Sequence, residues 1–117
     1  MNKDALQART KRFALESIRL VDTLPKSKTA DVLGRQLLRS ATSVAANYRA
    51  ACRGRSKAEF IAKLGIVVEE ADESMFWLEL MADAGLAESS RLQPLIREAD
   101  ELTAIFVASR KTAQRRL

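Results

Sequence analysis

Apolar residues recur at steps of three and four along most of the chain, which is the spacing of one face of an α-helix. No segment alternates between apolar and polar residues over the length that a half-buried strand requires. The pattern therefore predicts an all-α protein. The clearest run comprises Val32, Leu33, Leu37, Leu38, Ala41, Val44, Ala45, Tyr48 and Ala51.

The breaks between these runs carry residues that end helices. Pro25 forces Leu24 out of the helical region, and Gly54 and Gly85 are natural helix-ending residues. Pro94 is tolerated only near the start of a helix, so the last helix begins at position 89, 90 or 93. The predicted helices span residues 5–23, 30–52, 57–84 and 90–112.

The strongest local signal is the sequence Ser56-Lys57-Ala58-Glu59, an S-x-x-E capping box. In this pattern the serine and the glutamate each accept a hydrogen bond from a free amide group at the helix start. It follows Gly54, so one helix ends and another begins within a tight corner. Ser27 or Thr29 is expected to cap the preceding helix in the same way. Four helices with short connections predict an antiparallel up-down-up-down four-helix bundle, forming one domain over residues 1–117.

The third helix is apolar over more than one face. Phe60, Leu64 and Val67 begin one stripe, while Phe76 and Trp77 lie partly outside it. A helix of this kind needs more than one neighbour. Surplus apolar surface usually marks an interface, so self-association is expected.

A second strip on the second helix consists of small or amide residues beside the apolar stripe: Gln36, Ser40, Ser43 and Asn47. Such residues allow another helix to approach closely, and Asn47 can hydrogen-bond across a helix interface. The alternative is that the strip simply faces solvent. The predicted oligomer interface comprises Ser43, Asn47, Phe76, Trp77 and Leu80.

Charge is unevenly placed in a chain whose formal net charge is +5. From position 64 to position 90 there are acidic residues and no lysine or arginine. Before it stands a basic cluster, the predicted nucleic-acid-binding set: Arg35, Arg39, Arg49, Arg53, Arg55, Lys57 and Lys63. These cations favour binding to phosphates. The alternative is that they complement the helix dipole and aid solubility.

Four members of the basic cluster gather around the second corner and form the preferred phosphate-contacting set: Arg49, Arg53, Arg55 and Lys57. A C-terminal group is the reserve candidate: Arg110, Lys111, Arg115 and Arg116. If the basic end serves only assembly and solubility, the protein is instead an adaptor that binds other proteins.

Several kinds of chemistry are excluded by composition. The chain has no histidine, which removes histidine acid–base catalysis, Ser-His and Cys-His dyads and ordinary zinc sites. Its acids lack the Glu-x-x-His motifs of di-iron bundles. No metal, cofactor or enzymatic activity is therefore expected. The single Cys52 fits a reducing compartment, and the sequence shows no signal peptide or membrane span, so a cytoplasmic protein is expected.

The stretch from Gln36 to Phe60 resembles the four-helix bundle protein family whose founding members are encoded by intervening sequences within large-subunit ribosomal RNA genes. The matching positions, in order and spacing, are Gln36, Arg39, Ser43, Val44, Asn47, Arg55, Ser56, Glu59 and Phe60. The family's Asn-Ile-Ala-Glu-Gly reads Asn47-Tyr48-Arg49-Ala50-Ala51 here, so whatever its glutamate and glycine do is not carried over.

The resemblance implies an antiparallel four-helix bundle that assembles as a ring, often a pentamer, with no established enzymatic activity. The chain is also similar to the accessory protein of diversity-generating retroelements, a basic pentameric bundle that binds a reverse transcriptase and nucleic acid. The resemblance thus implies a homo-oligomer with RNA, DNA or a nucleic-acid-bound protein such as a reverse transcriptase as partner.

Overall fold

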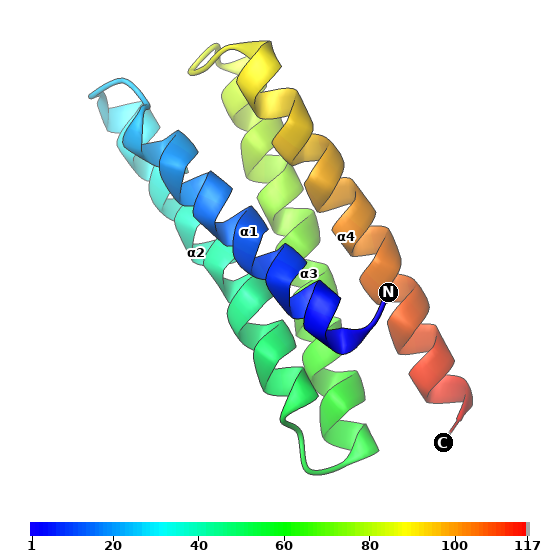
Figure 1. The fold of residues 1–117 in the computed structure, drawn as a ribbon. Coiled ribbons are helices and arrows are strands. Elements are labelled where there is room, and N and C mark those ends of the chain that lie inside the picture. The colour runs from blue at the N-terminus through cyan, green and yellow to red at the C-terminus, as the bar shows by residue number, and fades with distance from the viewer. Residues whose placement is uncertain (117) are drawn as a thin grey trace.

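The computed structural model describes residues 1–116 and consists of four antiparallel helices (Figure 1). Each helix packs against its neighbours in sequence, and α1 also touches α4 along a narrower contact. This arrangement confirms the predicted up-down-up-down bundle, which measures 47 × 20 × 19 Å. The helices are α1 (Lys3–Asp22), α2 (Lys28–Cys52), α3 (Lys57–Asp83) and α4 (Ser89–Arg115).

Polar side chains start the first three helices. Asn2 accepts a hydrogen bond from the Ala5 amide at 2.8 Å, and Ser27 accepts one from Ala30 at 3.1 Å. Ser27 is thus the cap of α2, rather than Thr29. Each of these caps satisfies one amide group that has no partner inside its helix.

Ser56 caps α3 as predicted, because its Oγ accepts a hydrogen bond from the Glu59 amide at 3.1 Å. The other half of the capping box differs from the expected pattern. The Glu59 carboxylate accepts from the backbone N–H of Arg55 at 2.7 Å, one residue before the cap. Glu59 therefore tightens the corner itself as well as the start of the helix.

A glycine ends α3. Gly85 has a φ of +66°, a conformation that other residues adopt only with strain. The Leu86 amide donates to the Met81 carbonyl at 3.0 Å, and the Gly85 amide donates to Ala82 at 3.1 Å. This pair of bonds is the Schellman motif, and it confirms Gly85 as the residue that stops the third helix.

The last helix is longer than the sequence indicated. It begins at Ser89 and continues to Arg115, whereas the prediction ended it at residue 112. Pro94 lies in its second turn, where the missing N–H leaves the Ser90 carbonyl without its helical partner. Both residues are exposed, so water is available to that carbonyl. Ala113, which is 8% exposed, packs inward and holds the last turn against the bundle.

The core runs the length of the bundle and is made of aliphatic and aromatic side chains. Leu37, Leu64, Leu78, Leu102 and Phe106 are fully buried. Because α3 lies between α2 and α4, it buries apolar residues on two sides within one chain. Those two contacts account for much of the apolar surface that the sequence analysis assigned to self-association.

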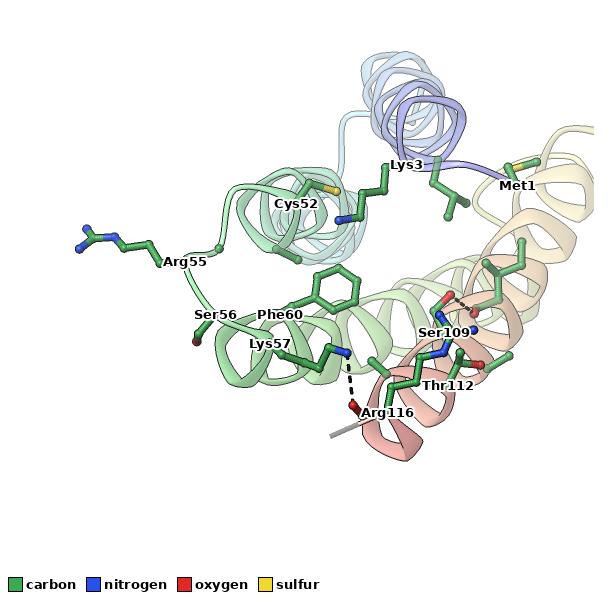
Figure 2. Close-up of a pocket in the computed structure, with 16 residues that line it drawn as sticks. Met1, Lys3, Cys52, Arg55, Ser56, Lys57, Phe60, Ser109, Thr112 and Arg116 are labelled. Atoms are coloured by element: carbon green, nitrogen blue, oxygen red, sulfur yellow. Dashed lines mark hydrogen bonds between the residues drawn. The ribbon is translucent and has the colours of Figure 1, made fainter.

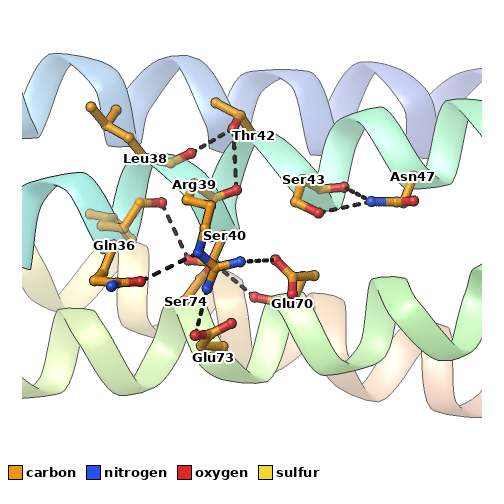
Figure 3. A network of polar contacts seen from close by, with 11 residues as sticks. Gln36, Leu38, Arg39, Ser40, Thr42, Ser43, Asn47, Glu70, Glu73 and Ser74 are labelled. Atoms are coloured by element: carbon orange, nitrogen blue, oxygen red, sulfur yellow. Dashed lines mark hydrogen bonds and ion pairs between the residues drawn. The ribbon is translucent and has the colours of Figure 1, made fainter.

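One polar contact crosses the core between α2 and α3. Ser40 and Ser74 are both fully buried, and the Ser74 hydroxyl lies 2.8 Å from the Ser40 hydroxyl (Figure 3). The small strip on α2 is therefore used partly inside the bundle. Asn47 donates to the carbonyl and the hydroxyl of Ser43 within its own helix, at 3.0 and 2.8 Å. Within residues 1–116 Asn47 thus makes no hydrogen bond to another helix, and its role in an oligomer interface stays a prediction.

The Ser56→Ala variant is expected to lower the free energy of unfolding by about 1 kcal/mol, the usual cost of a lost N-cap. Urea denaturation followed by circular dichroism measures this difference. The matched control is Ser90→Ala, since Ser90 is also exposed near a helix start but makes no side-chain hydrogen bond within residues 1–116. Equal stability of the two variants would contradict the capping role.

Candidate nucleic-acid interface

A groove between α1 and α2 brings three cations together. Lys11 from α1, Arg49 from α2 and Arg53 at the C-cap of α2 line it, and all three are exposed. Its volume is about 490 Å³. None of its lining residues is acidic, and none of these three cations makes a salt bridge within residues 1–116. We call this feature the basic groove.

The floor of the basic groove is made of small side chains. Besides the cations, Gln7 and Thr42, its lining consists of alanines: Ala8, Ala14, Ala45 and Ala46. Methyl side chains leave the space between the two helices open to a large ligand. Lys11 was not among the predicted residues, because nothing in the α2 pattern indicates which turn of α1 lies against it.

Arg55 and Lys57 lie on the other side of the corner from the basic groove. They line a cavity at the end of the bundle with Lys3 and Arg116 (Figure 2). The Lys57 ammonium group donates to the Arg116 carbonyl at 3.5 Å, whereas the Arg55 side chain points away from the cavity. The four preferred phosphate-contacting residues therefore divide between two neighbouring sites.

Three other predicted cations lie apart from this corner. Arg35 is fourteen residues before Arg49 on α2, about 21 Å at 1.5 Å per residue. It pairs with Asp31 on the same helix at 3.1 Å. Lys63 is half-buried on α3 and lines neither the groove nor the cavity.

Arg39 is held by two acids of α3. Its guanidinium lies 3.1 Å from Glu70 and 2.5 Å from Glu73 (Figure 3). Hydrogen bonding to Glu73, with a further contribution from Glu70, raises the pKa of Arg39. Two carboxylates already compensate this charge, so Arg39 is a weak candidate for binding phosphate. Its position instead links α2 to α3.

A second interhelical ion pair fixes α1 on α4. Arg9 donates to both oxygens of Glu98 at 2.7 Å, and Glu101 lies 3.5 Å away. The hydrogen bond to Glu98 raises the pKa of Arg9. The bidentate geometry makes this pair stronger than an ordinary surface pair. Arg9 is therefore not available to bind a ligand.

The exposed side of α3 combines acids with large apolar residues. Phe76 is 53% exposed and Ile66 is 39% exposed. We call this surface the α3 outer face; its members are Ala62, Ile66, Glu69, Asp72, Phe76, Glu79 and Asp83. Its two apolar side chains are the kind that an interface buries.

The other predicted interface residues are already partly covered within the chain. Trp77 and Leu80 are half-buried against the core, and the Trp77 ring meets Phe76 edge-on at 5.1 Å. Ser43 and Asn47 are half-buried on α2. Of the five predicted interface residues, Phe76 presents the most free surface.

In the core, Tyr48 of α2 packs on Phe106 of α4, with ring centroids 4.9 Å apart. Burial raises the pKa of the Tyr48 phenol, so it stays protonated.

Within residues 1–116 no cluster of three histidine, cysteine or acidic residues is placed to hold a metal ion. Over the same residues no helix combines the length and apolar character needed to cross a membrane.

Comparison with known proteins places this bundle in a family. A search of curated proteins gave no match. A solved structure from Bacteroides thetaiotaomicron, a protein of unknown function from the S23 ribosomal protein family, is similar with a TM-score of 0.87 and 29% identity. The similarity covers 95% of this chain and 99% of that one. Residues 4–108 match the family described as 23S rRNA-intervening sequence protein, and the chain therefore belongs to that family.

Proposed function

We propose that this protein is a non-enzymatic, self-associating helical bundle of the cytoplasm that binds nucleic acid through the basic groove. The observation that carries the proposal is the meeting of Lys11, Arg49 and Arg53 at one groove with no acid among its described lining residues. Cations free of internal partners retain their full charge for a phosphate backbone. Three other arginines, Arg9, Arg35 and Arg39, already have acidic partners.

The shape of the basic groove suits a phosphate backbone. Its alanine floor lets a strand approach, and cations stand on both helices that form its walls. Contacts of this kind fix the position of a strand without reading its sequence. The family's description refers to a 23S rRNA intervening sequence, so RNA is the first nucleic acid to test.

Self-association would multiply such contacts. The exposed Phe76 and Ile66 on the α3 outer face support it, and the resemblance favours a ring, with five subunits as the first expectation. A ring presents one basic groove per subunit, and binding at several grooves at once raises the overall affinity for the nucleic acid without any new kind of contact. We therefore infer that assembly and nucleic-acid binding act together.

A second candidate function is a protein adaptor. The α3 outer face carries Glu69, Asp72, Glu79 and Asp83 beside its apolar residues. An acidic surface repels phosphates and attracts a basic protein. In that case the partner docks on α3, for example a nucleic-acid-bound protein such as a reverse transcriptase, and the basic groove serves solubility.

Fluorescence anisotropy with labelled RNA and DNA separates the two functions. For nucleic-acid binding through several phosphates, affinity is expected to fall steeply between 50 and 200 mM salt, by about a thousandfold if some six contacts form in the assembly. Absence of binding at low salt, or an affinity that does not change with salt concentration, would favour the adaptor function.

A further inference from the structure

The end of the bundle holds a cavity of about 800 Å³ beside the basic groove. It opens between the start of α1, the α2–α3 corner and the last turns of α4 (Figure 2). Figure 1 shows that α1 begins short of the level of this corner, so α1 does not cover the ends of α2 and α3. The volume lies within the range of about 300–1,000 Å³ found for small-molecule sites.

The lining combines an apolar wall with hydroxyl groups. Among the lining residues that the structure describes, Phe60 is the only aromatic one, and Leu6 and Ile105 lie with it. Ser109 and Thr112 of α4 add hydroxyl groups to the wall. The Ser109 hydroxyl donates to the Ile105 carbonyl at 2.9 Å, but its oxygen can still accept a hydrogen bond, and the exposed Thr112 hydroxyl can donate or accept one. A heteroaromatic ring offers polar atoms at its edge for such bonds, whereas a purely aliphatic ligand offers none.

Positive charge surrounds this cavity. The Lys3 ammonium group lies over the Phe60 ring, 5.0 Å from its centre, and Lys57 lies at the α4 side of the opening. None of the described lining residues is acidic. The site thus pairs an aromatic face with cations, the combination that single-stranded nucleic acids meet in proteins that stack their bases.

We propose that the end cavity receives one unpaired nucleobase, which takes the place of the Lys3 ammonium group on the Phe60 ring while its phosphate pairs with Lys3 and Lys57. This inference rests on the proposed function. Arg53 of the basic groove and Arg55 of the cavity lining are separated only by Gly54, so one strand passes from groove to cavity around the corner. A base held in a duplex cannot enter, and the protein therefore prefers single-stranded RNA.

The test fills the cavity from its edge. Ala108 is exposed and lines the cavity, so Ala108→Trp places a large ring in it without disturbing the core. Ala104, one turn earlier on α4, is also exposed but does not line this cavity, so Ala104→Trp is the matched control. Wild type and control are expected to bind a single-stranded RNA about tenfold more tightly than a duplex of equal charge. Ala108→Trp should lose this preference and keep its duplex affinity, whereas a preserved preference would overturn the proposal.

Adding adenosine monophosphate tests ligand binding in the end cavity separately from RNA binding in the basic groove. Amide NMR shifts around Phe60 and Thr112 on its addition, absent in Ala108→Trp, would support the proposal even if no RNA bound the groove. No shifts with adenosine monophosphate, or shifts with decanoate alone, would overturn it. If adenosine monophosphate causes these shifts but the protein does not bind RNA, only the proposed function of the basic groove is contradicted.

Discussion

Replacing Lys11, Arg49 and Arg53 together with alanine is expected to lower affinity for RNA about a hundredfold at low salt. Each residue supplies a charged contact, and losing about 1 kcal/mol at each of three contacts corresponds to that factor. All three side chains are exposed and none is in a salt bridge within residues 1–116, so the fold should be unaffected. Anisotropy measures the affinity, and circular dichroism checks the helices.

The matched control removes three cations from the opposite end of the bundle. Lys26, Lys28 and Arg35 border a hollow at the α1–α2 corner, and replacing them with alanine changes the net charge equally. If binding depended on overall charge alone, the two triple variants would lose the same affinity. A groove-specific contact predicts that the control loses no more than a few-fold.

The Phe76→Glu variant is expected to convert an oligomer into a monomer of 13.0 kDa. Phe76 is 53% exposed on a helix face already lined by acids such as Asp72 and Glu79. A further carboxylate, buried without a partner in an interface, costs several kcal/mol. Sedimentation velocity at micromolar concentration measures the effect.

Leu15→Glu is the control for this experiment. Leu15 is 42% exposed on α1, which lies diagonally across the bundle from α3. It should leave the oligomer intact. A wild-type protein that sediments as a monomer would contradict self-association altogether. Trp77→Glu is less informative, because Trp77 packs against the core of its own chain and its loss would also weaken the fold.

Much of the fold could be predicted because local signals agreed with one another. The apolar spacing located all four helices, and Ser56 and Gly85 marked two boundaries through backbone chemistry that acts within a few residues. The end of α4 was missed for the opposite reason. The residues from Arg110 to Arg116 are mostly polar or charged, and the one buried residue among them, Ala113, packs onto the other helices near the end of α4 at Arg115.

The candidate site was less predictable, because it depends on how helices align side by side. Spacing on α2 identified Arg49 and Arg53, but the position of Lys11 depends on the register of α1 against α2. In the same way, no local pattern shows that Arg39 meets Glu70 and Glu73, residues more than thirty positions later. Six of the seven cations predicted as one cluster therefore divide among a groove, a cavity and internal ion pairs, and Lys63 belongs to none of these.

The salt dependence of RNA binding tests the central claim most directly. The slope of log affinity against log salt counts phosphate contacts, at about 0.7 per contact for a single strand. The variant lacking Lys11, Arg49 and Arg53 should therefore show a slope shallower than wild type by about 2 for each protomer that contacts the strand. Equal slopes for wild type and variant would contradict the assignment of phosphate binding to the basic groove.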